Sequence, residues 1–272
     1  MPTPHKTRSG VMRNLNVQPR SPASRVMLVC FCIMLTFALA CSACGGGSEQ
    51  RASHDPANEW GSPDIYDDFS GTNPEFQLDN PAGVAHGWYA DGRFNITYPA
   101  KGWWTWYSGS SSAMNFYVDV VVYNGDQCLD RDAVGLLYRY IQGSDSGLMF
   151  GVTCGGGYFK GLTGWLGAGN GVCLFTNANP SGPTDLDCSA IWEHPTSSHI
   201  NDGPGAANRL GVLAQDNQIT MYINGHEVDS ITISPTVPQY GEFALYLGST
   251  QPDNASASFD DFSVWLEPSE GP

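Results

Sequence analysis

Positive charge is scarce in this chain of 272 residues, and its scarcity excludes two classes of partner. There are 12 Lys and Arg against 27 Asp and Glu, which gives a formal net charge of −15. A surface with this excess of carboxylates repels phosphate backbones and anionic lipid headgroups. We therefore expect no nucleic acid among the partners, and no attachment to an anionic membrane through surface charge.

The chain also lacks a sustained repeat of apolar residues at the 3.6-residue period of a helix. Short apolar runs alternate instead with turn-forming residues, among them 32 Gly and 18 Pro. Asp outnumbers Glu by 19 to 8, and Asp favours turns whereas Glu favours helices. This pattern predicts an all-β fold in which helices are few and short.

The apolar run Val26–Ala40 has 15 residues, which is too short to span a bilayer comfortably. Five basic residues and no acidic residue precede it. A basic segment followed by an apolar run of this length is typical of a signal peptide.

The residues around Cys41 suggest how this segment is processed. Ala38-Leu39-Ala40 precedes Cys41, and a stretch rich in Gly and Ser follows. Small residues before a cysteine and a flexible segment after it resemble the lipobox of bacterial lipoproteins. The resemblance implies a lipoprotein signal peptide over residues 1–40 and a lipidated flexible tether over residues 41–63, with the Cys41 thiol as the lipid acceptor.

Two alternatives to lipidation at Cys41 are open. Cys44 is the other candidate acceptor, and cleavage near Ala40 or Ala43 would give a free secreted protein. A lipidated protein would lie in the cell envelope, on the outside of a bacterial membrane. Attachment would come from its acyl chains alone, at about 0.8 kcal/mol per buried CH₂, because the chain after residue 40 carries a net charge of −20.

Residues 64–268 are expected to form one domain with a substantial core. The candidate strands are residues 65–69, 88–98, 103–107, 115–123, 134–141, 147–153, 158–162, 209–215, 218–223, 227–233, 241–248 and 257–266. Asn224-Gly225, between two of these strands, is a strong signal for a type I′ hairpin turn.

The last strands carry a family resemblance. The sequence NRLGVLAQDNQITMYINGHEVDSI, followed by GEFALYLG and FDDFSVW, resembles the closing strands of concanavalin A-like (laminin G-like) domains. Residues 66–70 resemble that family's first strand, which pairs near the last one. The resemblance covers residues 65–266 and implies a jelly-roll β-sandwich of two antiparallel sheets. The family includes lectins, glycan-binding modules, glucanases and 3-keto-disaccharide hydrolase-like domains, so the fold leaves the function open.

Four cysteines lie in the predicted domain: Cys128, Cys154, Cys173 and Cys188. Outside the cytoplasm an even set indicates two disulfides, with three pairings to choose from. A hairpin of residues 134–141 with 147–154 would set Cys154 opposite Val134, near the loop of Cys128. Cys173 and Cys188 would bracket the loop 177–183. We therefore predict the bridges Cys128–Cys154 and Cys173–Cys188; a zinc site is the rival, but the CxxC spacing of a zinc knuckle is missing.

The laminarinase-type motif Glu-x-Asp-x-x-Glu is absent, since none of the eight Glu has this spacing. Glycosidases need two carboxyl groups facing one bond, so the absence argues against that chemistry. The hydrolase-like resemblance implies instead a polar cluster, with Asp119, Arg139, His194 and His199 as candidates. Solvated loop histidines are the alternative. No catalytic residue is assigned, and no cofactor is required.

Aromatic side chains are the more informative candidates. Alternation along the strand 103–107 places Trp104 and Trp106 on one face, and Trp103 and Tyr107 on the other. Exposed rings stack on the apolar faces of sugars, and polar neighbours bond to the hydroxyls. The predicted ligand-binding residues are Trp103, Trp104, Trp106, Tyr107, Tyr138 and Arg139, with core packing as the alternative for each ring.

Paired acids mark a candidate metal site. Asp67-Asp68 and Asp260-Asp261 lie on strands that are expected to be neighbours. Several relatives of this fold join the first and last strands through a structural Ca²⁺, and the resemblance makes Asp68 and Asp260 the candidate ligands. The alternative is that these carboxylates cap turns or face water.

These observations together predict a surface-anchored lipoprotein that carries a carbohydrate-binding, lectin-like β-sandwich. The expected partners are a glycan ligand and, through the lipid, a membrane. A 3-keto-disaccharide hydrolase-like enzyme and a protein-interaction scaffold are the alternatives.

Overall fold

The computed structural model describes residues 55–71, 74–76, 86–98, 103–144, 146–163, 172–175, 186–187, 195–249 and 255–267. In these ranges the secondary structure is almost entirely β, as the sequence predicted, and the helices are two short 3₁₀ turns, η1 (Pro56–Asn58) and η2 (Gln142–Ser144). The strands are β1 (Ile65–Asp67), β2 (His86–Ala90), β3 (Arg93–Tyr98), β4 (Trp103–Ala113), β5 (Phe116–Asn124), β6 (Ala133–Ile141), β7 (Ser146–Thr153), β8 (Tyr158–Thr163), β9 (Val172–Phe175), β10 (Leu186–Asp187), β11 (Ala207–Gln215), β12 (Gln218–Ile223), β13 (His226–Thr232), β14 (Gly241–Ser249) and β15 (Ala255–Leu266).

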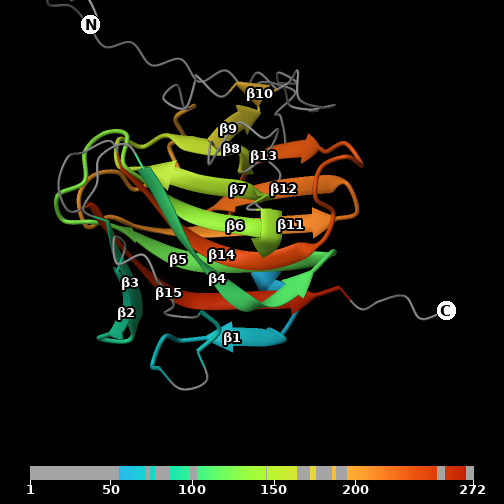
Figure 1. Cartoon of the computed structure of the whole chain (residues 1–272), viewed down its shortest axis with the longest axis horizontal. Helices are drawn as coiled ribbons and strands as arrows, with labels where there is room; N and C mark the ends of the chain where they lie inside the picture. The colour runs from blue at the N-terminus through green and yellow to red at the C-terminus, as the bar shows by residue number, and fades with distance from the viewer. Residues whose placement is uncertain are drawn as a thin grey trace, which may run out of the picture. The chain divides into compact units, whose positions relative to one another are not determined.

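The strands form two antiparallel sheets (Figure 1). One has eight strands in the order β13-β12-β11-β5-β15-β3-β2, with β1 paired to β15 as well. The other has seven strands in the order β10-β9-β8-β7-β6-β14-β4. The predicted fold class, a jelly-roll β-sandwich of two antiparallel sheets, is confirmed, and so is the pairing of the first strand with the last.

Alternation along each strand explains the core. In β5, Phe116, Val118, Val120 and Val122 are fully buried between the sheets, whereas Tyr117, Asp119, Val121 and Tyr123 point to the outer face. Core aromatic rings pack edge to face, as Phe116 does on Phe243 with 4.8 Å between ring centroids. The space between the sheets is therefore filled, and the remaining side chains of the strands lie on two outer faces.

One predicted strand divides in two. Residues 88–98 form the hairpin β2–β3, in which Asp91 (φ 55°) and Gly92 (φ 69°) make a left-handed turn. An Asp-Gly pair favours a type I′ turn, but the sequence analysis assigned this segment to one continuous strand. The predicted turn at Asn224-Gly225 has the same geometry, with φ of 51° and 79°.

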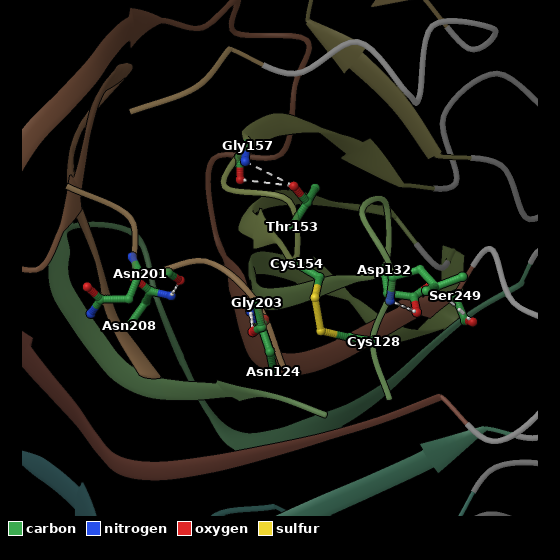
Figure 2. Close-up of a disulfide and its surroundings, with 11 residues drawn as sticks. Asn124, Cys128, Asp132, Thr153, Cys154, Gly157, Asn201, Gly203, Asn208 and Ser249 are labelled. Carbon is green, nitrogen blue, oxygen red and sulfur yellow. Dashed lines mark hydrogen bonds between the residues drawn. A yellow bond between two sulfur atoms is a disulfide. The ribbon is translucent and has the colours of Figure 1, made fainter. Parts of the chain in front are cut away.

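The predicted disulfide Cys128–Cys154 is present and joins the loop before β6 to the end of β7 (Figure 2). The expected register is wrong by two residues, because Val134 faces Val152 instead of Cys154. One residue of the difference arises at the turn, where Ile141 faces Ser146 instead of Gly147, and the other at a bulge between Tyr138 and Ile141, where Arg139 has φ 50°. The bridge still forms, because the Cys154 amide donates to the Asp132 carbonyl (2.8 Å) and holds the loop against β7.

Several predictions fall outside the described residues: the signal peptide, both candidate lipid acceptors and Cys188. Of Cys173 only the backbone, in β9, is described, so the Cys173–Cys188 bridge stays a prediction. Within the described ranges, no helix combines the length and the apolar character that crossing a membrane requires.

The last residues of the predicted tether pack on the sandwich and are not a flexible segment. Residues 55–63, assigned by the sequence to a flexible segment, include η1 and make specific contacts with the sandwich. The Trp265 indole donates to the Gly61 carbonyl (2.9 Å), and Trp60 packs on Tyr117. The packed part of the chain therefore includes Asp55 and does not begin at Asp64.

Candidate functional site

In the part of the chain that the structure describes, the outer face of the eight-stranded sheet brings exposed aromatic and polar side chains together. Its cross-strand rows follow from the register. The first two rows are Trp88–Asn95–Ser258–Tyr123 and Asp260–Val121–Arg209. The next two rows are Tyr66–Ser263–Asp119–Gly211–Tyr222 and Trp265–Tyr117–Leu213–Thr220. Residues in neighbouring rows on one face are in reach of each other, so this face is one continuous surface.

The first part of this face, which we call the open half, consists of Tyr66, Trp88, Arg93, Asn95, Tyr123, Ser258, Asp260 and Asp261. Trp88 and Tyr66 are 40% and 56% exposed. Part of each side chain is therefore accessible to a ligand.

Polar contacts hold the open half in place. The Arg93 guanidinium lies 3.7 Å from the centre of the Tyr123 ring, and its Nε lies 3.8 Å from Asp260 Oδ2. The Ser258 hydroxyl donates to Asn95 Oδ1 (2.7 Å), and Asn95 Nδ2 donates to the Arg93 carbonyl (3.2 Å). These residues come from β3, β5 and β15, so three strands position one set of hydrogen-bonding groups.

Acidic groups border the open half. The Tyr66 hydroxyl donates to Asp261 Oδ1 (2.8 Å), and this bond, with burial and nearby carboxylates, raises the pKa of Tyr66 to about 12. Partial burial and the charge of Asp261 raise the pKa of Asp260. The Ser70 amide, which donates to Asp68 Oδ1 (3.0 Å), lowers the pKa of Asp68. The electrostatics of this edge are therefore set by crowded carboxylates.

The second part of the face, the covered half, consists of Tyr117, Asp119, Arg209, Tyr222 and Trp265. Tyr117 lies 5.4 Å from Trp265 and 6.0 Å from Tyr222, centroid to centroid. Gly211 leaves room for this cluster, since a Cβ there would lie 2.5 Å from the Tyr117 hydroxyl. All three rings are buried, because residues 55–61 lie over them.

Asp119 is the buried carboxylate of the covered half. Arg209 Nη1 lies 3.4 Å from Asp119 Oδ2, and the Tyr117 hydroxyl donates to the same oxygen (3.3 Å). Burial raises the pKa of Asp119 to about 6, although the charge of Arg209 acts in the opposite direction. Arg209 also pairs with Asp55 through Nη2, so one guanidinium joins the covering segment to the sheet.

The outer face of the seven-stranded sheet has a different character. One row runs Trp106–Tyr246–Gly135–Gly151–Phe159, and the next runs Ser108–Ala244–Leu137–Met149–Gly161. The two glycines of the first row make room for the Tyr246 ring, because a Cβ at Gly151 would lie 1.9 Å from its hydroxyl. The side chains of these two rows are mostly apolar or aromatic, in contrast to the charged groups of the eight-stranded sheet.

The four predicted ligand-binding residues whose side chains are described do not share one exposed surface. Trp106 is partly buried on the outer face of the seven-stranded sheet, where its indole donates to the Tyr140 hydroxyl (2.8 Å). Tyr107 points the other way, into the core against Phe94. The backbones of Trp103 and Trp104 belong to β4, but their side chains lie outside the described residues.

The prediction that Tyr107, Tyr138 and Arg139 reach a ligand is not supported, because all three are buried. Tyr138 faces the core between the sheets. Arg139 is turned by the bulge of β6 and donates to the Met114 and Asp216 carbonyls (2.7 and 2.6 Å), so it ties two loops together.

The polar cluster expected for a hydrolase-like enzyme does not assemble from the described candidates. Asp119 bonds with Tyr117 and Arg209, whereas Arg139 bonds with loop carbonyls. His199 stacks on His226 with 4.0 Å between centroids, and His194 lies outside the described residues.

The two calcium candidates lie on the same acidic edge, since the charge of Asp68 is one of those that raise the pKa of Asp260. Within the described ranges, however, no group of three or more His, Cys, Asp or Glu is arranged to hold a metal ion. Asp260 is instead engaged by Arg93 and by the Asp261 amide (3.0 Å). The calcium site therefore stays a prediction.

Sequence reasoning missed Trp88, Arg93 and Tyr123, which all belong to the open half. The Asp91-Gly92 turn was the available signal, since a hairpin there sets Trp88 opposite Asn95 on the outer face. Arg93 and Tyr123 are 30 residues apart in the chain, so only the tertiary pairing of β3, β15 and β5 unites them.

No protein-family model and no curated protein matches this sequence. Solved structures do resemble it. A carbohydrate-binding module from Bacillus subtilis is 15% identical, with a TM-score of 0.43 over 62% of this chain and 86% of that one. The kappa-carrageenase from Pseudoalteromonas carrageenovora is 12% identical, with a TM-score of 0.48 over 74% and 92%. A lichenase derived from a mouse hindgut metagenome is 12% identical, with a TM-score of 0.47 over 75% and 99%. At these values the likeness assigns neither ligand nor reaction to this chain.

Proposed function

We propose that this chain is a surface-anchored lipoprotein whose β-sandwich binds carbohydrate on the outer face of the eight-stranded sheet. One observation carries the binding proposal: in the open half, half-exposed rings of Trp88 and Tyr66 lie on one surface with the hydrogen-bonding groups of Asn95, Arg93 and Asp260. A sugar ring presents C–H groups on its faces and hydroxyls around its edge. A flat ring beside fixed donors and acceptors is complementary to both.

The anchoring part of the proposal rests on the sequence alone: the signal-like segment, the small residues before Cys41 and the Gly/Ser stretch after it. Expression in a bacterial host with labelled palmitate tests it. Label should enter the wild-type chain and Cys44→Ser but not Cys41→Ser. Label lost only in Cys44→Ser would move the acceptor, and no label in any chain would favour a free secreted protein.

A screen of plant and microbial polysaccharides by affinity electrophoresis tests the binding proposal. We expect retardation of the chain by at least one neutral polysaccharide and no shortening of that polysaccharide during prolonged incubation. Shorter products would favour the enzyme alternative instead. Retardation by none, with a protein partner recovered from envelope extracts, would favour the scaffold.

A further inference from the structure

Residues 55–61 lie over the covered half through three kinds of contact. The Trp60 ring packs on Tyr117, with 6.4 Å between centroids. The Trp265 indole donates to the Gly61 carbonyl (2.9 Å), and Asp55 pairs with Arg209. Within the segment, Asp55 caps η1 by accepting from the Ala57 amide (3.2 Å). The segment is thus a short, pre-shaped piece of chain fastened at both ends.

The surface beneath it has the same chemistry as the open half. It combines three aromatic rings with a carboxylate, Asp119, and a guanidinium, Arg209. The two halves are also continuous. Asp119 shares a cross-strand row with the exposed Tyr66, and Arg209 shares one with Asp260. A polysaccharide that lies across the open half would therefore meet residues 55–61 at the boundary.

We propose that residues 55–61 form a strap that closes one half of a single, longer glycan-binding face, and that the Asp55–Arg209 ion pair is the latch that holds the strap shut. This inference rests on the proposed function, because it takes the open half to be a glycan site. Displacing the strap adds Tyr117, Tyr222 and Trp265 to the stacking surface. The extended face then accommodates more sugar units than the open half alone.

Asp55 is the residue whose loss should open the strap. Its side chain joins two contacts, the Arg209 pair across the interface and the Ala57 cap within η1. Arg209 keeps a partner when Asp55 is lost, since Asp119 lies on its other side. Asp55→Asn should therefore release the strap without leaving an unpaired charge in the sandwich.

The first readout does not involve a glycan. Hydrogen exchange of the full chain in detergent reports on the amides of Asn58, Glu59 and Trp60, which are bonded within the strap. We expect Asp55→Asn and Trp60→Ala to speed exchange there while amides of β5 and β11 stay protected. Asp202→Asn removes an exposed charge in the loop before β11 and serves as the matched control. Unchanged exchange in Asp55→Asn would overturn the latch.

The second readout is affinity for a polysaccharide that binds the wild-type chain. If the strap is open in about one tenth of molecules, its release raises the apparent affinity up to about tenfold. Faster exchange with unchanged or weaker affinity would overturn the strap as a gate and leave the proposed function standing. No binding by wild type or by either strap variant would overturn both.

Discussion

The guanidinium of Arg93 lies over the ring of Tyr123, 3.7 Å from its centroid, although the two residues belong to strands separated in the sheet by β15. Asp260, on β15, faces the same guanidinium from between them. This stack fixes the middle of the open half. A mutation of Arg93 should therefore change the affinity for a glycan more than the free energy of unfolding.

Replacing Arg93 with Ala should cost little stability, because Arg93 is 41% exposed and an exposed cation–π contact contributes about 0.5–1 kcal/mol. Affinity for a glycan should fall more steeply, since a donor is lost and the Tyr123 ring is no longer held. Urea unfolding and affinity electrophoresis measure the two effects. Arg131→Ala, at an exposed position before β6, is the control, and equal loss of affinity in both variants would contradict the role of Arg93.

Asp119 should make stability depend on pH in a defined direction. Its pKa in the folded protein is raised to about 6 from 3.8, so its contribution is fully present below about pH 4 and is lost as the pH rises through 6. Relative to Asp119→Asn, the wild type should therefore lose up to about 3 kcal/mol of unfolding free energy between pH 4 and pH 7. Parallel pH profiles of the two proteins would refute the raised pKa.

Gly151 should not tolerate a side chain, because Tyr246 and the Val134 backbone occupy the space that a Cβ would need. A Cβ at Gly151 would lie 1.9 Å from the Tyr246 hydroxyl, so Gly151→Ala should destabilise the fold by about 1–3 kcal/mol. Tyr246→Phe removes the nearest of the clashing atoms and leaves the Val134 carbonyl oxygen 2.5 Å from the Cβ, so it should relieve only part of the cost. The double variant should therefore be more stable than the sum of the single effects predicts, and strict additivity in urea unfolding would show that the two positions do not meet.

The Cys128–Cys154 bridge closes a loop with a sequence separation of 26, for which the chain-entropy relation gives about 3–4 kcal/mol. Replacing both cysteines with Ser should lower the unfolding free energy by that order. A non-reducing peptide map of exported protein checks the pairing and tests Cys173–Cys188 in the same experiment. A fragment joining Cys154 to Cys173 would contradict both assignments.

The strands could be predicted from sequence because alternation and turn residues are local signals. Residues 218–223 were predicted as a strand with the bounds that β12 has, and Asn224-Gly225 was predicted as the turn that follows. Strand β6 shows that alternation does not predict the accessibility of side chains in a strand whose two faces are both buried. It is buried on both faces from Ala133 to Tyr140, so the period of two says nothing about which side chains are accessible. Tyr138 and Arg139 are buried for this reason, although the sequence pattern suggested that they were accessible.

The candidate site could not be predicted, because it depends on pairings between distant segments. Asp55, Asp119 and Arg209 meet across 154 residues of sequence, and no local pattern indicates that they do. The polar character of residues 55–63 suggested a free linker. Only the apolar faces of Trp60 and Trp265 pointed to packing, and two isolated tryptophans are a weak signal.

The central claim is that carbohydrate binds the open half, and Trp88 tests it most directly. Isothermal titration of a polysaccharide found in the screen should compare wild type with Trp88→Ala and Tyr240→Ala, the latter removing a ring that is 54% exposed but outside the open half. Loss of one stacked ring at about 0.5–1.5 kcal/mol should weaken binding by about two- to tenfold in Trp88→Ala and leave Tyr240→Ala close to wild type. Equal affinity in Trp88→Ala and wild type would contradict the account.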